Sequence, residues 1–230
     1  MNKIGVIFAM DEELNELLKL VELENQYDIF DIPFYECKLG EKELVLAKAG
    51  IGKVNAARCS QILIDNMDVD CIFNIGVAGS VAKDVHICDI VIGEKLVQHD
   101  FDITAFNHDK GFIPNIGTVY VESDPYLVKV AQDTKIDSNI HTGVIASGDI
   151  FCTEEAMSKK INSKFGALCV EMEGASIAQV CYLSHIPFLV IRSISDSLNE
   201  EDNKIAYEEF LEISSGKVAS YLKEIILGLE

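Results

Sequence analysis

The sequence predicts an α/β fold with a mixed central sheet flanked by helices. Short apolar runs of strand length alternate along most of the chain with segments of helical spacing, a pattern typical of helices packed on a sheet. Hydrophobic residues make up 49% and charged residues 25%, the proportions of an ordinary globular protein. No linker rich in Pro, Gly or Ser and no repeat interrupts the pattern, so residues 1–230 are expected to form a single domain.

The first half of the chain is expected to open with a buried strand and a helix. The apolar run 3–8 predicts the strand, and the acidic residues after it favour a helix over 12–20 capped by Asp11. The later elements are a hairpin of 29–39 and 44–47 turned at 40–42, a helix over 53–67 and the strongly apolar strand 70–77.

The second half of the chain continues the alternation. Asp124 is the expected cap of a helix that runs through Ala131. Apolar side chains at helical spacing predict a long closing helix over 205–227. The other expected elements are strands over 89–97, 140–146 and 188–194 and a helix over 172–183. In such a sheet, ligands bind at the carboxyl ends of the strands, which directs attention to the residues found there.

The charge of the chain excludes two classes of partner. Lys and Arg number 19 against 38 Asp and Glu, a net charge of −19. Nucleic acids and anionic membrane surfaces would be repelled, so neither is expected as a partner. No apolar run reaches the length of a membrane span, and residues 1–13 lack the layout of a signal peptide.

The cysteines and histidines predict neither disulfides nor a metal site. The seven cysteines are odd in number, none forms a C-x-x-C pair, and most lie in apolar runs, so buried free thiols in the reducing cytoplasm are expected. His99-Asp100 and His108-Asp109 form a polar cluster without the ligand spacing of a known zinc motif. A polar loop is the simpler interpretation, and no metal or cofactor is expected.

Two glycine-containing segments follow predicted strands. Gly50-Ile51-Gly52-Lys53 is neither a Walker A loop nor a dinucleotide fingerprint, because Ala47, Val54 and Asn55 stand at required positions. A tight structural turn and a close backbone approach to a ligand both remain open. The segment Asn74–Gly79 offers a flat surface that suits a planar ring, or close packing between sheet and helix.

Two acidic segments follow apolar runs of strand length, 167–170 and 188–194. Glu171-Met172-Glu173 opens a helix, where one carboxylate could bind a sugar diol and Glu171 could instead cap the helix. Asp196 ends the last strand beside serine hydroxyls, which suits either a general acid with a raised pKa or a helix cap.

Together the segments resemble one family along nearly the whole chain. Five motifs occur in matching order and spacing: IGVIFAMDEE at 4–13, GIGKV at 50–54, ASGD at 146–149, VEME at 170–173 and RSISD at 192–196. They are similar to those of the 5′-methylthioadenosine/S-adenosylhomocysteine nucleosidases of the purine nucleoside phosphorylase superfamily. The resemblance implies a nucleoside phosphorylase-like fold, a homodimer, and hydrolysis of an adenine nucleoside without metal or cofactor.

The resemblance also assigns residues. Glu13 corresponds to the activator of the attacking water, and Asp196 to the acid that protonates adenine N7. Phe151 corresponds to the aromatic stacked on the base, and the backbone of Cys152 to the reader of the adenine edge. Glu173 corresponds to the carboxylate on the ribose hydroxyls. The remaining substrate-binding positions implied are Gly79, Ile51, Met172, Arg192 and Tyr207.

The sequence departs from the family pattern at three positions; the changes at His108 and Tyr207 leave the 5′-substituent open, and Val77 removes a hydroxyl near the water or ribose. Val77 replaces a usual serine, His108 replaces an aromatic contributed by the partner subunit, and Tyr207 replaces a common phenylalanine. The rival activities are a nucleosidase for 5′-deoxyadenosine or aminofutalosine, a nucleoside phosphorylase, and an inactive nucleoside sensor. The acidic Asp11-Glu12-Glu13 disfavours phosphate as the nucleophile, and the presence of both Glu13 and Asp196 disfavours the sensor.

Overall fold

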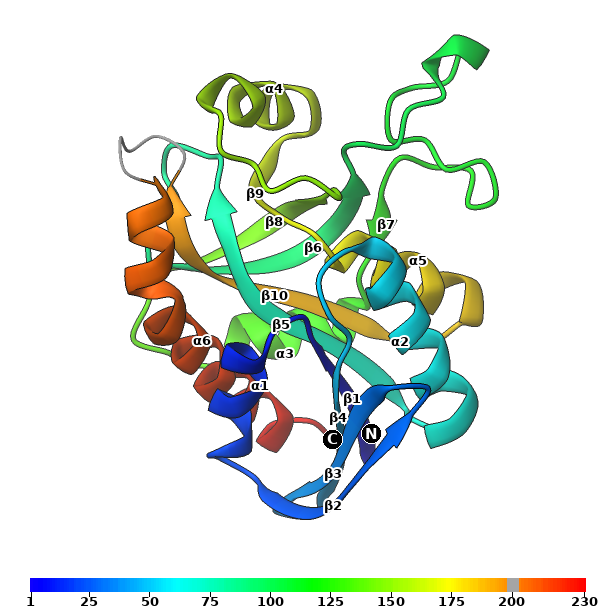
Figure 1. The fold of residues 1–230 in the computed structure, drawn as a ribbon, viewed down its shortest axis with the longest axis vertical. Helices are drawn as coiled ribbons and strands as arrows, with labels where there is room; N and C mark the ends of the chain where they lie inside the picture. The colour runs from blue at the N-terminus through cyan, green and yellow to red at the C-terminus, as the bar shows by residue number, and fades with distance from the viewer. Residues whose placement is uncertain (198–202) are drawn as a thin grey trace.

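The computed structural model describes residues 1–197 and 203–230, and the side chains of 1–197 and 210–230. In this part of the chain, ten strands form one mixed sheet with helices on both faces (Figure 1). The α/β prediction is therefore confirmed. The elements are β1 Lys3–Phe8, α1 Asp11–Leu18, β2 Glu22–Ile29, β3 Ile32–Leu39, β4 Lys42–Lys48, α2 Lys53–Met67, β5 Cys71–Ser80, β6 Ile90–Gln98, the 3-10 helix η1 Thr104–Phe106, β7 Val121–Glu122, α3 Pro125–Asp133, β8 Ile140–Ser147, α4 Glu155–Phe165, β9 Ala167–Glu171, α5 Gly174–Ser184, β10 Phe188–Ser197 and α6 Asn203–Leu227.

The strands that matter for the site meet at β5. This strand pairs in parallel with β1 and with β10, and its last residues pair with β9. The strand order is β10-β6-β8-β9-β5-β1-β4-β3-β2, with β7 beside β6. Because β10 pairs with both β6 and β5, the sheet closes on itself on one side of β5. The carboxyl ends of β1, β5 and β10 consequently lie together.

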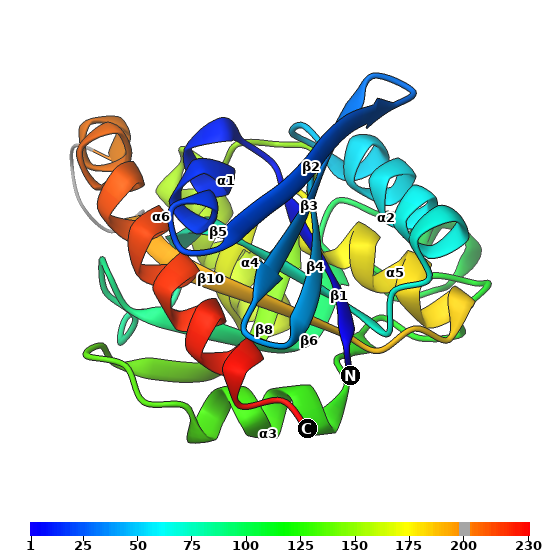
Figure 2. The same cartoon turned by 90° about the horizontal axis from the view of Figure 1, so that it is seen from below.

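Each face of the sheet carries its own hydrophobic core. Adjacent residues of β5 serve opposite faces, since Phe73 packs with α1 and α6 while Ile72 packs with α2 and α5. Figure 2 shows α1 and α6 on one side of the strands and α2 and α5 on the other. Among the described helices, none combines the length and apolar composition that a membrane crossing requires.

Several elements differ from the sequence-based expectation, among them β2, α4, β7 and η1. The expected strand 29–39 is split, because Phe30 and Asp31 adopt positive φ values of 50° and 63° and turn β2 back onto β3. The side chains of β2 are mostly exposed, so its sequence carries no apolar alternation. Helix α4 was not expected either, because only Ser158, Ile161 and Phe165 of its eleven residues are buried.

Side-chain hydrogen bonds to backbone N–H groups mark the first residues of α1 and α3. Asp124 caps α3 as predicted, since its carboxylate accepts the N–H groups of Tyr126 and Leu127. The prediction that Asp11 caps the first helix is wrong. Met10 is the N-cap residue, and the carboxylate that reaches back to its N–H belongs to Glu13. Glu13 therefore fixes the start of α1 in addition to any role in the site.

Candidate active site

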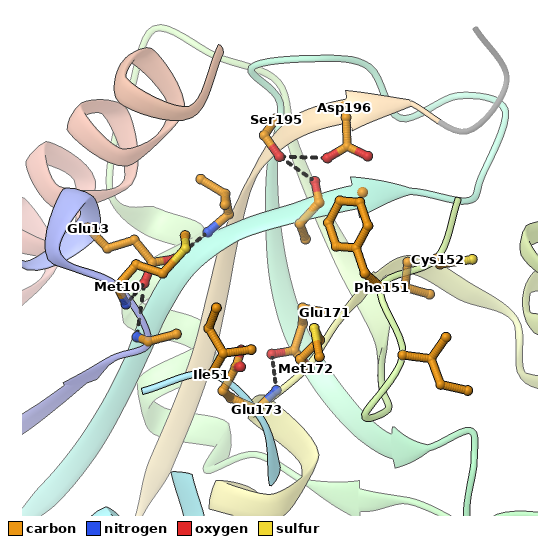
Figure 3. A pocket seen from close by; sticks show the side chains of 16 residues that line it. Met10, Glu13, Ile51, Phe151, Cys152, Glu171, Met172, Glu173, Ser195 and Asp196 are labelled. Carbon is orange, nitrogen blue, oxygen red and sulfur yellow. Dashed lines mark hydrogen bonds between the residues drawn. The ribbon is translucent and has the colours of Figure 1, made fainter. Parts of the chain in front are cut away.

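A pocket lies at the carboxyl ends of β1, β5 and β10, where the two central parallel pairs end. Figure 3 shows Glu13, Glu173 and Asp196 approaching it from three sides. Its lining comes from segments spread along the chain, as expected for a ligand site in an α/β sheet. The lining residues are Ala9, Met10, Glu13, Ile51, Val77, Ala78, Gly79, Ile150, Phe151, Cys152, Val170, Glu171, Met172, Glu173, Ser195 and Asp196.

The Glu13 carboxylate is held by three backbone N–H groups. Oε2 accepts from Ala9 at 2.9 Å and from Met10 at 3.1 Å, and Oε1 accepts from Val77 at 3.1 Å. Burial raises the pKa of Glu13, while the charge of Arg192 and these N–H groups oppose the rise. The result is a buried carboxylate with a fixed orientation and an increased affinity for a proton, as a general base requires.

The space for this carboxylate exists because residue 76 is glycine. A Cβ added at Gly76 would overlap Oε1 of Glu13 and lie 3.0 Å from its Cδ. The sequence suggested that the flat stretch 74–79 could receive a planar ring, but the bare backbone at 76 receives the carboxylate. The Val77 departure also takes a definite form here, because its N–H binds Glu13 although the valine offers no hydroxyl.

Asp196 enters the pocket from a bulge in β10. Pairing with β5 steps from Ile194–Ala78 to Asp196–Gly79, which leaves Ser195 as an extra residue. Bulges of this kind re-aim a side chain and are common beside active sites. The Ser195 hydroxyl donates to Asp196 Oδ1 at 2.7 Å. A Cβ at Gly79 would lie 2.9 Å from Asp196 Oδ2, so a second glycine of β5 makes room for a second carboxyl group.

Glu173 forms the third acidic side of the pocket. Its Oε1 accepts the N–H of Gly52 at 2.7 Å, at the start of α2. Burial and the neighbouring charge of Glu171 raise the pKa of Glu173 to about 8, against the lowering effect of the Gly52 N–H. A carboxyl at this position can exchange its proton easily near neutral pH and can accept hydrogen bonds from neighbouring hydroxyls.

Glu171 and Arg192 form a buried ion pair beneath these groups. The Arg192 guanidinium donates to Glu171 Oε2 and to the side chain and carbonyl of Asn74. Glu171 Oε2 also accepts the N–H groups of Glu173 and Gly174 at 3.0 and 2.7 Å. The Glu171 carboxylate therefore binds N–H groups at the start of α5, as the alternative interpretation of the sequence suggested, although the N-cap position itself belongs to Glu173.

The remaining predicted contacts lie around the pocket opening. Ile51 and Phe151 are about half exposed, Cys152 is buried, and Met172 stands between the two glutamates. Figure 3 shows the Phe151 ring on the same side of the view as Asp196, with Glu13 on the other side. An apolar, partly open rim of this kind suits a flat ligand with an apolar extension.

The structure brings together most of the residues that the sequence nominated. Eight of the ten line the pocket: Glu13, Asp196, Gly79, Phe151, Cys152, Met172, Glu173 and Ile51. Arg192 is not in the lining and lies behind Glu171. The side chain of Tyr207 is outside the described residues. His108 stacks on Phe112, with ring centroids 4.5 Å apart, away from the lining residues.

Sequence reasoning missed the residues that shape the pocket without reacting. Met10 and Ile150, which line the pocket, belong to this group. Gly76 lies in the stretch 74–79 that the sequence singled out, but its place against the Glu13 carboxylate was not expected. The described residues contain no group of three or more His, Cys, Asp or Glu side chains arranged to hold a metal ion.

Comparison with known proteins finds matches to one superfamily and to nucleosidases within it. A family model described as the phosphorylase superfamily matches residues 3–227. A protein named 5′-methylthioadenosine/S-adenosylhomocysteine nucleosidase from Exiguobacterium sp. is 40% identical over 99% of both chains. An aminodeoxyfutalosine nucleosidase from Helicobacter pylori is 37% identical over 97% of this chain and 97% of its own. The structure of the 5′-methylthioadenosine/S-adenosylhomocysteine nucleosidase from Neisseria meningitidis, in complex with methylthio-immucillin-A, matches with a TM-score of 0.95 at 34% identity, covering 100% of both chains.

Proposed function

The chain belongs to the phosphorylase superfamily, and from that premise we propose that it hydrolyses the N-glycosidic bond of 5′-methylthioadenosine and S-adenosylhomocysteine. The products are adenine and the 5-thioribose, as needed in methionine salvage and in the clearance of S-adenosylhomocysteine. The observation that carries the proposal is the placement of Glu13, Glu173 and Asp196 on three sides of one pocket. The names of the full-length relatives support the choice of substrate.

Each acidic group has a separate task in this reaction. Glu13 takes a proton from a water molecule while the oxygen of that water forms a bond to the sugar carbon C1′. The bond from C1′ to adenine N9 breaks, and Asp196 donates its proton to adenine N7, so adenine leaves neutral. Glu173 binds the ribose hydroxyls. The sugar carries positive charge in the transition state, and the nearby carboxylates stabilise it.

The other pocket residues bind the nucleoside. Phe151 stacks on adenine, and the backbone of Cys152 reads its edge, as the family resemblance implies. Ile51, Met172 and Gly79 complete the contacts, and Arg192 acts from behind Glu171 through its charge. Tyr207 remains a proposed contact by resemblance alone.

Water is proposed as the nucleophile in preference to phosphate. Four carboxyl side chains and no Lys, Arg or His are among the lining residues in the described part of the chain. A phosphate dianion would be repelled by the ionised Glu13 and would find no cationic side chain among these lining residues to bind it. The test is adenine release with and without phosphate. Free 5-methylthioribose in both conditions supports hydrolysis, whereas a sugar 1-phosphate formed only with phosphate present would contradict it.

A second candidate substrate is an aminofutalosine. The Helicobacter pylori relative named for aminodeoxyfutalosine is nearly as similar as the methylthioadenosine enzymes. The half-exposed rim at Ile51 leaves room for a larger 5′-group. A panel of adenine nucleosides, compared by kcat/KM, decides between the two substrates.

The assembly and the setting are proposed as a homodimer in the cytoplasm. Val54 on α2 and Phe106 on η1 are 77% and 75% exposed, which is unusual for large apolar side chains. Figure 1 shows η1 on a loop that extends beyond the body of the fold. All seven cysteines are free thiols, as suits a reducing compartment. A fully active monomer in sedimentation experiments at micromolar concentration would refute the dimer.

The proposed partners are small-molecule adenine nucleosides, with no nucleic acid and no membrane, because of the charge of −19. One sheet draws its strands from both halves of the chain, which supports a single nucleosidase domain over residues 1–230.

A further inference from the structure

Three sequence motifs that the proposed function leaves without a role meet at the start of α2. They are the glycine turn ending at Lys53, the His99-Asp100 pair and the ASGD motif ending at Asp149. Hydrogen bonds join Lys53, Asp100 and Asp149 across 96 and 47 positions of sequence. The contact also lies next to the pocket, because Ile150 and Phe151 follow Asp149 directly.

The three residues form a closed ring of hydrogen bonds. The backbone N–H of Lys53 donates to Asp149 Oδ1 at 2.8 Å. The backbone N–H of Asp149 donates to Asp100 Oδ2 at 3.0 Å. The Lys53 ammonium donates to Asp100 Oδ1 at 2.6 Å, which closes the ring. Each residue is bound to both others, so displacing one of them breaks two bonds.

The ionic side of the ring is largely shielded from water. The Lys53 and Asp100 side chains are 16% and 19% exposed, against 66% and 63% for the surface pair Lys129–Asp133. Burial raises the pKa of Asp100, but the Lys53 ammonium and the Asp149 N–H outweigh it and hold the pKa below its usual value. Asp100 therefore stays ionised, and the ring stays intact across the neutral range.

Two residues of the segment that the ring holds are only half buried, although Cys152 at its end belongs to a buried apolar cluster. Ile150 and Phe151 are 48% and 47% exposed, and the chain between β8 and α4 has no regular secondary structure. Gly52, with a φ of 99°, lets the carboxylate approach, because a Cβ there would lie 3.2 Å from Asp149 Oδ1. The same turn binds Glu173 through the Gly52 N–H. One end of α2 thus fastens both the Phe151 segment and the Glu173 carboxyl.

We propose that Asp149 is a positioning residue that, through its bonds to Lys53 and Asp100, holds residues 149–152 over the pocket so that the adenine ring is bound in register with Glu173. The inference rests on the proposed nucleosidase function. Asp149 does not touch the substrate in this scheme. Its effect is on binding of the base, which the enzyme needs equally in the ground state and in the transition state, so its loss raises KM more than it lowers kcat.

The test compares Asp149→Ala with Asp149→Asn, which keeps an oxygen that accepts the Lys53 N–H. We expect Asp149→Ala to raise KM and the inhibition constant of adenine about tenfold, with kcat changed less than about threefold. Asp149→Asn should recover most of that loss. Asp100→Ala, which breaks the ring elsewhere, should shift the same two constants, and Asp133→Asn on the exposed pair serves as the control.

The adenine measurement separates this inference from the function on which it rests. If the wild-type protein releases adenine and binds it, but Asp149→Ala does both equally well, the positioning role is wrong and the function stands. Equal losses in Asp149→Ala and Asp149→Asn would also overturn the role. If the wild-type protein neither binds adenine in calorimetry nor releases it from any nucleoside, the proposed function itself fails.

Discussion

Replacing Glu173 by glutamine should make the protein more stable at alkaline pH. The Glu173 side chain is buried beside Glu171, and its pKa is raised to about 8 by burial and then by that neighbouring charge. Glutamine has nearly the same size and keeps an oxygen that can accept the Gly52 N–H. The substitution therefore removes a buried charge and leaves the contacts in place.

The sign and size of the effect follow from linkage. Below pH 4.5 the carboxyl is protonated in both the folded and the unfolded protein, so it has no effect on stability. Between 4.5 and about 8 only the unfolded protein loses the proton, so the free energy of unfolding falls as pH rises, and the full cost is present above 8. Each tenfold change in proton affinity is worth about 1.4 kcal/mol, which sets an upper limit of about 5 kcal/mol.

Urea denaturation at pH 5 and pH 9 measures this difference. Glu173→Gln should exceed the wild-type free energy of unfolding by about 2–5 kcal/mol at pH 9 and by less than about 1 kcal/mol at pH 5. The exposed Glu41→Gln serves as the control and should change neither value. A gain of equal size at both pH values would refute the reasoning, because it would not come from ionisation.

Three further results are expected. Glu13→Gln and Asp196→Asn should each lower adenine release by about 10²-fold or more with the fold retained. The fold-loss of activity in the double variant should be smaller than the product of the two single losses. Near wild-type release by either single variant would mean that this residue is not part of the mechanism. Gly76→Ala should lower kcat/KM by about 10²-fold, since its Cβ would occupy the site of the Glu13 carboxylate, and unchanged kinetics would contradict the described slot. The acidic limb of the kcat/KM profile should have an apparent pKa above 4.5, because burial raises the pKa of Glu13; a limb at or below 4.5 would mean that another group is the base.

Sequence patterns predicted the fold class and the residues that meet at the strand ends. Apolar runs identified β1 and β5 because these strands are buried on both faces. Asp196 was conspicuous because it follows such a run, and the resemblance of five short motifs to one family assigned both Glu13 and Asp196. Strand ends lie in a predictable place in an α/β sheet, so acidic residues there are conspicuous.

Features that depend on tertiary contacts could not be found in this way. Strand β2 has mostly exposed side chains, and the strand with which it pairs is β3. Asp149 is a surface aspartate in an irregular segment, and only its distance to Lys53 gives it a role. Arg192 matched a family site position by resemblance, but its guanidinium lies behind Glu171, bonded to Glu171 and Asn74, and is not among the lining residues.

The two glycines of β5 have a consequence for how such a pocket can diversify. Gly76 faces Glu13 and Gly79 faces Asp196, so one strand sets the separation between the two ends of the reaction. A strand advances by about 3.3 Å per residue and has little freedom to stretch, so the separation between Glu13 and Asp196 is fixed by the strand. Ile51 and Phe151 stand on loops that can change length and composition independently. A preference for a different nucleoside can thus arise from substitutions in the loops around the pocket opening, while the sheet keeps Glu13 and Asp196 in the same positions.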